Sequence, residues 1–184
     1  MKHLTTKLLA RAGIIAALYV GLTVVFGELA YGPLQIRPAE ALTVLPVFFP
    51  EAAVALYVGC LLANLFSGYG LPDILLGPIV SLAAGLLTRL IYKKTENIFL
   101  AALPPVLLNG FLIPLIFMMT GTPWSEYWVC AGSLLLTEAV FIYTIGVGVY
   151  YSLKRLRQRE IAFLFWDRSV NVTPSSRRDC RPPR

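Results

Sequence analysis

Long apolar stretches, separated by short polar or Gly/Pro-rich turns, make up most of the chain. A helix that spans a bilayer needs about 20 mainly apolar residues, and the chain has room for about six of them. We expect helices over residues 8–29, 39–49, 51–66, 73–92, 97–120 and 126–153. The pattern therefore predicts an all-α integral membrane protein, a bundle of six transmembrane helices over residues 1–155. Residues 156–184 are basic and are predicted to form a disordered cytoplasmic tail.

The second and third of these segments are each short for a full crossing. Pro50 separates them, and the loop before them, residues 31–38 (YGPLQIRP), is rich in Pro and Gly. We expect either one broken hairpin or two tilted helices here. Irregular backbone is tolerated inside a membrane bundle where it lines a cavity. This region is therefore a candidate binding site.

Composition agrees with the membrane class. The 184 residues are 57% hydrophobic and 14% charged, with a mean hydropathy of +0.70, whereas soluble domains carry about 25% charged residues. The net charge of +6 comes from basic residues at the ends of apolar runs, which indicates membrane orientation rather than nucleic-acid binding. Six crossings place these residues on the cytoplasmic side, namely Lys2, Lys7, Arg11, Lys93, Lys94, Lys154, Arg155, Arg157 and Arg159. Both termini are then cytoplasmic, in a multi-pass protein of the cell membrane.

The sequence lacks the residues and motifs that several kinds of chemistry require. His3 is the only histidine, and Cys60, Cys130 and Cys180 form no CxxC pair, so we expect no metal site, cofactor or disulfide framework. The sequence also has no GxxxxGK[ST] phosphate loop. The chain is therefore not expected to hydrolyse ATP or to be an enzyme that relies on histidine.

Glu138 is the most informative polar residue, because it lies in the middle of the apolar run 129–151. A charged side chain at the centre of a bilayer costs several kcal/mol, so such residues usually face the interior of a bundle and mark a functional site. A carboxylate can accept hydrogen bonds from two adjacent N–H donors. The alternative is a structural pair with another buried polar group.

Other polar residues allow both a functional and a structural interpretation. Asn109, in the middle of the fifth segment, is either a ligand or part of an interhelical hydrogen bond. Arg37 departs from the cytoplasmic concentration of basic residues, and we interpret Arg37 and Glu40 as lining the mouth of a cavity. Glu40 would also suit the first turn of a helix. For Asn64 we favour neither interpretation. Asp73 is interpreted as a charge at a helix start.

Small residues repeat at a spacing of four on the first predicted helix. Ala12 and Ala16 form one such pair, and Gly13 and Ala17 form another. A small-xxx-small face allows another helix to approach closely. The face could contact a partner subunit or pack within the chain.

Two phrases are specific when taken together: RxxEALTVLP at residues 37–46 and ANLxSGxGxxDIxxG at residues 63–77. With the stretch 35–85 around them, they resemble the queuosine-precursor transporter family of QueT type. The similarity continues at 103–115 (LPPVLLNGFLIPL) and 134–146 (LLLTEAVFIYTIG) and covers roughly residues 5–155. Members of this family are substrate-binding S components of energy-coupling factor (ECF) transporters.

The resemblance implies a six-helix fold with a site that opens to the outside and is covered by the first loop. It implies three partner subunits, a transmembrane T component and two cytoplasmic ATPase subunits. An AxxxA face on the first helix of S components contacts the T component, and Ala12 and Ala16 match it. Thr137 stands where the family pattern favours glycine, and a bulkier residue there would narrow the pocket.

The cargo implied by the resemblance is a queuosine precursor, a 7-deazaguanine. Its guanine-type edge carries an N–H beside an NH₂ group, which we expect the Glu138 carboxylate to bind with both oxygens. Asn109 would bind the base carbonyl or a ring nitrogen, and Glu40 an aminomethyl cation. Tyr69 or Trp128 would stack on the ring.

Three alternatives remain open at this point. The same kind of subunit could carry another flat heterocyclic vitamin. An intramembrane enzyme would use Glu138 and Asp73 as paired carboxylates, although no nucleophile accompanies them and the six-helix arrangement places them far apart. A purely structural helix-packing protein would leave Arg37 and Glu138 unexplained. Saturable binding of a substrate without turnover would distinguish an S component from the last two.

Overall fold

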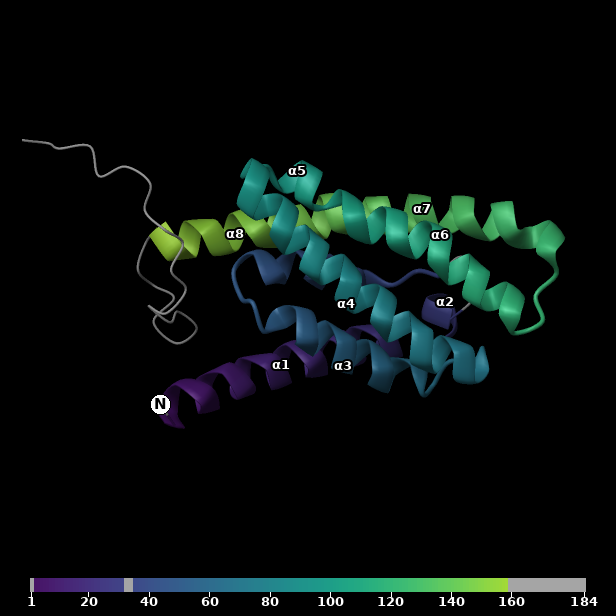
Figure 1. The fold of residues 1–184 in the computed structure, drawn as a ribbon, viewed down its shortest axis with the longest axis horizontal. Helices are drawn as coiled ribbons and strands as arrows, with labels where there is room; N and C mark the ends of the chain where they lie inside the picture. The colour runs from purple at the N-terminus through teal and green to yellow at the C-terminus, as the bar shows by residue number, and fades with distance from the viewer. Residues whose placement is uncertain (1, 32–34, 159–184) are drawn as a thin grey trace, which may run out of the picture.

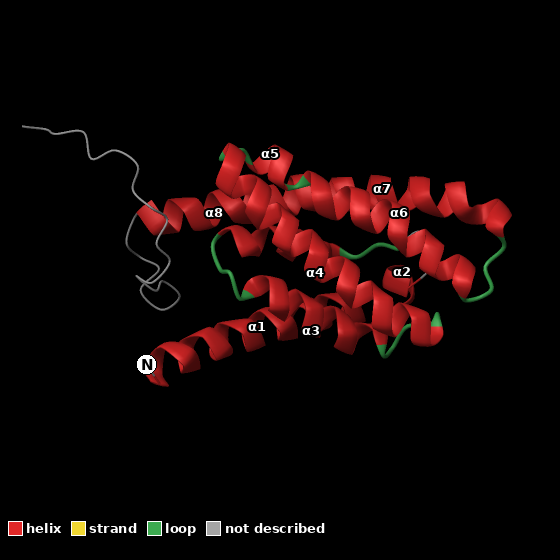
Figure 2. Ribbon diagram, viewed as in Figure 1, coloured by secondary structure: helices red, strands yellow, loops and turns green. Residues whose placement is uncertain are grey.

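Helices form throughout the described part of the chain, residues 2–31 and 35–158 of a computed structural model, and no strand occurs there (Figures 1 and 2). A helix pairs its backbone N–H and C=O groups within one segment, as a bilayer requires. The elements are α1 (Lys2–Phe26), α2 (Glu28–Tyr31), the 3₁₀ helix η1 (Pro38–Val47), α3 (Ala52–Asn64), α4 (Gly70–Thr95), α5 (Ile98–Ala101), α6 (Leu103–Met119), the 3₁₀ helix η2 (Trp124–Glu126), α7 (Tyr127–Phe141), the π-helix η3 (Ile142–Gly146) and α8 (Val147–Gln158). The predicted all-helical class is confirmed.

Four helical stretches are long and apolar enough to cross a membrane: Thr5–Phe26, Gly70–Thr95, Ile98–Met119 and Trp124–Arg157. They correspond to the first, fourth, fifth and sixth predicted helices, with ends that shift by a few residues. α1 ends before Gly27, whose φ of 45° is a left-handed conformation that favours glycine. α4 includes Pro72 in its first turn, where the N–H that proline lacks has no helical partner.

The two remaining apolar helices are short, as the sequence predicted. The ten residues of η1 and the thirteen of α3 each extend about 20 Å, whereas the hydrocarbon core of a bilayer is about 30 Å thick. η1 is a 3₁₀ helix rather than the predicted α-helix, and it contains Pro46. The count of six membrane crossings therefore stays a prediction.

η1 is surrounded by other helices and occupies the centre of the described fold. It contacts α1, α3, α4, α7, η3 and α8, and most of its side chains are buried. Gly146 in η3 approaches η1 so closely that an added Cβ would lie 3.0 Å from the Ala41 carbonyl oxygen. Glycine at this position lets η1 pack directly against the long helical stretch that carries Glu138.

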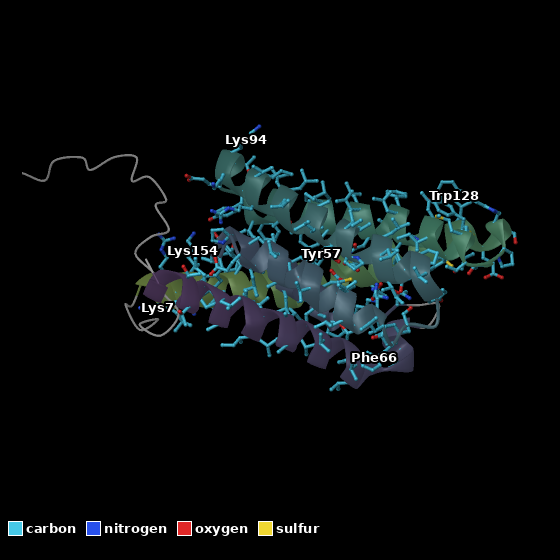
Figure 3. All side chains as sticks on the ribbon, turned by 60° about the horizontal axis from the view of Figure 1, so that its bottom comes forward. Lys7, Tyr57, Phe66, Lys94, Trp128 and Lys154 are labelled. Carbon is cyan, nitrogen blue, oxygen red and sulfur yellow. The ribbon has the colours of Figure 1, made fainter. Side chains whose placement is uncertain are left out.

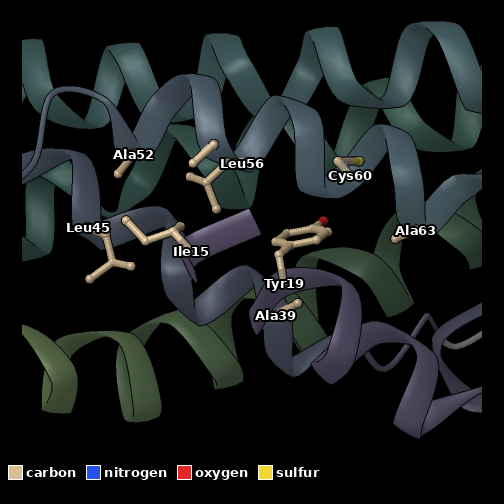
Figure 4. Close-up of a cluster of buried hydrophobic side chains, with 9 residues drawn as sticks. Ile15, Tyr19, Ala39, Leu45, Ala52, Leu56, Cys60 and Ala63 are labelled. Atoms are coloured by element: carbon tan, nitrogen blue, oxygen red, sulfur yellow. The ribbon is translucent and has the colours of Figure 1, made fainter. Parts of the chain in front are cut away.

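Apolar packing joins η1 to α1 and α3 (Figure 4). Ile15 and Tyr19 of α1 lie against Leu45 of η1 and Leu56 of α3 in one buried cluster. Gly59 lets α1 and α3 come together, because an added Cβ would lie 2.9 Å from the Tyr19 Cβ. This packing holds Tyr19 and η1 in fixed positions beside each other.

The two ends of the bundle differ in the side chains they present. Lys7, Lys94 and Lys154 lie toward one end, while Phe66 and Trp128 lie toward the other (Figure 3). This is the separation that the positive-inside pattern predicts. The predicted disordered tail falls almost entirely on residues 159–184, which lie outside the described residues.

Candidate functional site

Glu138 lies on the face of α7 that points into the protein. Its side chain is 3% exposed, whereas Leu136 and Val140 on the same helix are exposed. Its Oε2 atom has no hydrogen-bond partner among the described residues. Buried polar atoms are normally paired, and an unpaired acceptor is unfavourable. Glu138 therefore presents a buried acceptor to any guest molecule that carries N–H donors.

Glu40 from η1 differs from Glu138 because both of its carboxylate oxygens are paired. The Tyr19 hydroxyl donates to Oε1, and Asn109 Nδ2 donates to Oε2 over 3.2 Å. Asn109 also lies beside the Glu138 carboxyl group, so one amide stands between two acids. We call Tyr19, Glu40, Asn109 and Glu138 the central cluster. Its members come from four elements, α1, η1, α6 and α7, which only the tertiary fold brings together.

Arg37, immediately before η1, places a buried positive charge near this cluster. Its Nε donates to the Ala30 carbonyl over 3.0 Å, and its guanidinium carbon lies 5.7 Å from the centre of the Tyr31 ring. Glu40 and Glu138 are both within its electrostatic range. The Arg37 Nη2 atom has no hydrogen-bond partner in the part of the chain that the structure describes. Arg37 thus balances part of the negative charge of the two acids without forming an ion pair with either.

A second polar group lies where α3 ends and α4 begins. Asn64 Nδ2 donates to the backbone carbonyl of Asp73 over 2.9 Å, and both side chains are 0% exposed. Asn64 Oδ1 and both Asp73 carboxylate oxygens lack partners within the described ranges. Gly77, one turn later, leaves room for this arrangement, because an added Cβ would lie 2.6 Å from Asn64 Nδ2. We call Asn64, Asp73 and Gly77 the Asp73 cluster. Asp73 lies in the first turn of α4, as predicted, but its complete burial was not foreseen.

The two aromatic candidates occupy different environments. The Tyr69 ring stacks on Phe117, with 4.0 Å between the ring centres and 16° between the planes. Trp128 is 74% exposed and packs edge-on against Tyr127. The structure therefore keeps Tyr69 near the buried polar groups, within electrostatic range of Arg37, but does not bring Trp128 to them.

The small residues of α1 lie on two neighbouring faces of the helix, one covered and one exposed. Ala16 is 8% exposed, and Ala12 packs against the buried cluster between α1, η1 and α3. Gly13, Ala17 and Gly21 are exposed. Ala12 and Ala16 pack inside the chain because α3 lies against that face of α1, and their contact with a partner stays a prediction. The parallel Gly13 and Ala17 face points outward.

Tyr19 is the member of the central cluster that sequence reasoning missed. A signal was present, because the hydroxyl of a buried tyrosine usually finds a hydrogen-bond partner, and Tyr19 lies in the middle of the first apolar run. The cluster as a whole combines carboxylates, an amide and a hydroxyl. Over residues 2–31 and 35–158, no group of three or more His, Cys, Asp or Glu residues could hold a metal ion. The arrangement is suited to recognising a polar guest by hydrogen bonds.

Comparison with known proteins agrees with the resemblance seen in the sequence. The profile of the QueT transporter family matches residues 9–155. The chain is 34% identical over 99 residues to the queuosine precursor transporter QueT of Lactococcus lactis subsp. cremoris (strain MG1363), across 53% of this chain and 58% of the relative. The matched part of the chain thus spans somewhat more than half the length of this curated relative. No solved structure matches the chain.

Proposed function

The chain belongs to the QueT transporter family, and from this premise we propose that it is the S component of an ECF-type importer for a queuosine precursor. In this proposal the chain binds a 7-deazaguanine from outside the cell. A transmembrane T component and two cytoplasmic ATPase subunits then drive uptake, because the sequence has no phosphate-binding loop of its own. The curated relative, named as a queuosine precursor transporter, supports this choice of cargo.

The unpaired Oε2 atom of buried Glu138 is the observation that carries the proposal. The guanine-type edge of a 7-deazaguanine presents an N–H next to an NH₂ group. A carboxylate can accept both hydrogen bonds side by side, and bonds to an ionised acceptor are stronger than neutral ones. Binding would therefore supply the donor to Oε2 that the described part of the protein does not provide.

The rest of the central cluster holds the binding groups in place. Tyr19 and Asn109 occupy both oxygens of Glu40, so in this proposal Glu40 orients Asn109 rather than contacting the cargo. Asn109 is then fixed beside Glu138, where its amide can contact the base carbonyl or a ring nitrogen. Ligand sites are most effective when their groups are already oriented before binding.

Contact with the T component is assigned to the outward face of α1. Gly13, Ala17 and Gly21 are exposed there at a spacing of four residues. Small residues let a neighbouring helix approach closely within a membrane. Of the two small-residue pairs in the sequence, the one that points away from the chain's own core is the better candidate.

Orientation follows from the basic end of the bundle. Lys7, Lys94 and Lys154 lie toward one end (Figure 3), and positive residues are concentrated on the cytoplasmic side of membrane proteins. We assign this end, together with both termini, to the cytoplasm. The substrate would then enter from the end that carries Phe66 and Trp128.

Calorimetry with the purified chain tests the proposal. A panel of 7-deazaguanines and unrelated flat vitamins such as riboflavin and thiamine is titrated into the wild type and Glu138→Gln. We expect saturable binding of 7-deazaguanine to the wild type without turnover. Glu138→Gln is expected to weaken binding by roughly 10- to 100-fold, because hydrogen bonds to charged groups contribute about 1.5–3 kcal/mol.

The matched control is Glu126→Gln, which makes the same chemical change at an exposed acid on the same helical stretch. It is expected to bind like the wild type. Unchanged affinity in Glu138→Gln would remove Glu138 from the site. Preference for another vitamin would keep the S-component role and change the cargo, while conversion of a substrate by the purified chain would favour an enzyme.

A further inference from the structure

The Asp73 cluster is a buried polar group that the proposed function does not use. Its residues belong to the phrase ANLxSGxGxxDIxxG at residues 63–77. Three acceptor atoms there, Asn64 Oδ1 and the two Asp73 carboxylate oxygens, have no hydrogen-bond partner among the described residues. Both side chains are 0% exposed, so the membrane and its headgroups do not reach them.

A purely structural role as a helix cap does not explain these atoms. Asp73 lies in the first turn of α4, where its charge suits the helix dipole. Its carboxylate oxygens nevertheless accept no hydrogen bond from the free N–H groups of that turn, nor from any other described donor. Burying a carboxylate without such partners is strongly unfavourable. Something other than the described part of this chain is expected to pair with it.

We propose that Asp73 and Asn64 bind a primary ammonium group carried by the cargo, an inference that rests on the proposed function. An ammonium group has three N–H donors, and the two side chains leave three acceptors unpaired. Its positive charge complements the Asp73 carboxylate. A guest bound in this way would be held at two places, its base edge by Glu138 and its ammonium substituent by Asp73.

Arg37 connects the two places electrostatically. It lies within electrostatic range of Asp73, Glu40 and Glu138. No ion pair joins Arg37 and Asp73 within the described residues, and each of them retains unpaired polar atoms. Of the three buried acids near Arg37, Asp73 is the one with no hydrogen-bond partner on either carboxylate oxygen among the described residues, so it is the acid most open to a cationic group.

Glu40 is a less suitable ammonium ligand than Asp73 because of its own contacts. The sequence suggested Glu40 for a cation, but Tyr19 and Asn109 already donate to both of its oxygens. Asp73 has no such partners among the residues described. The assignment therefore moves from Glu40 to Asp73.

The test compares two ligands, 7-deazaguanine and 7-(aminomethyl)-7-deazaguanine, on the wild type and on Asp73→Asn. We expect the wild type to bind the aminomethyl compound roughly tenfold or more tightly than the parent base, because charged hydrogen bonds are strong. Asp73→Asn should abolish that preference while it leaves the affinity for 7-deazaguanine within about twofold. Glu126→Gln, which neutralises an exposed acid, should keep the preference.

A second measurement uses only the wild-type protein and so does not depend on the folding of a variant. The trimethylammonium analogue keeps the positive charge but has no N–H donors, and it should lose the preference. Equal affinities of the wild type for the parent base and the aminomethyl compound would overturn this inference alone, as would a preference that survives in Asp73→Asn. Absence of binding for every deazaguanine would overturn the proposed function as well.

Discussion

The central cluster and the Asp73 cluster both bury carboxylates, but they differ in how far the protein satisfies its own acids. In the central cluster, Glu40 accepts hydrogen bonds from two other helices. Glu138 Oε2 has no hydrogen-bond partner among the described residues. In the Asp73 cluster, no described donor reaches either carboxylate oxygen of Asp73. From this difference we infer that burial alone does not identify a binding residue. The presence or absence of internal partners separates an acid that connects helices from one that is available to a ligand.

The largest effect on stability is expected from Glu40→Gln. Glutamine would replace one of the two acceptor oxygens with an NH₂ group, so one of the donors Tyr19 and Asn109 would lose its acceptor, and the negative charge would be lost. We expect the free energy of unfolding to fall by about 2 kcal/mol. Thermal unfolding in detergent micelles measures this loss. Glu138→Gln, which removes an acid with an unpaired oxygen, should change stability by less than about 1 kcal/mol. Equal losses in the two variants would contradict the contrast between them.

Gly77→Ala tests the packing of the Asp73 cluster. The added Cβ would lie 2.6 Å from Asn64 Nδ2 and 3.3 Å from Asp73 Oδ1, so both side chains must shift. Overpacking of this kind costs about 1–2 kcal/mol, and we also expect the preference for an aminomethyl ligand to shrink. Gly132→Ala is the matched control, because the structure places nothing within 4 Å of its Cβ. A Gly77 variant as stable as the Gly132 variant would refute the close contact.

Tyr19→Phe removes the hydroxyl that donates to Glu40 and keeps the ring. Loss of this hydrogen bond is expected to lower the free energy of unfolding by about 1 kcal/mol. In a double-mutant cycle, Tyr19→Phe and Glu40→Gln should be less than additive, because both remove the same interaction. Strict additivity would show that the two side chains do not interact.

Trp128→Ala should have the smallest effect. The side chain is 74% exposed at the end of the bundle away from the lysines (Figure 3). We expect the affinity for 7-deazaguanine to stay within about twofold of the wild type. A large loss of affinity would show that Trp128 reaches the ligand after all and that the site extends beyond the buried clusters.

Much of the fold could be predicted from local patterns. The apolar runs indicated the four long helices because membrane-spanning segments need both length and composition. The 3₁₀ conformation of η1 was not predictable, since it arises where a proline-containing segment is packed on all sides. The sequence also did not indicate that Ala12 and Ala16 point toward the inside of the chain. Both faces of α1, that of Ala12 and Ala16 and that of Gly13 and Ala17, have small residues at the same spacing. Only the position of α3 decides which face is covered.

For the candidate site, too, the sequence predicted some features and not others. Glu138, Asn109 and Glu40 were identified individually, because polar residues in apolar surroundings stand out. Their pairing was not predicted, and neither were the roles of Tyr19 and Asp73. The sequence treated Asp73 as an ordinary helix-start charge, which its position in α4 confirms. Its unpaired, fully buried carboxylate depends on how α3 and α4 pack.

The sequence by itself determined that this protein is helical, lies in a membrane and carries acids among apolar residues, because these properties follow from composition and short-range spacing. Only the tertiary structure decided which of those acids accept hydrogen bonds from other helices. The two bonds to Glu40 join residues 21 and 69 positions apart in the chain, and donors at such separations meet only when distant helices pack together. Whether a buried carboxylate has a partner is therefore a property of the packing, while its presence is a property of the chain.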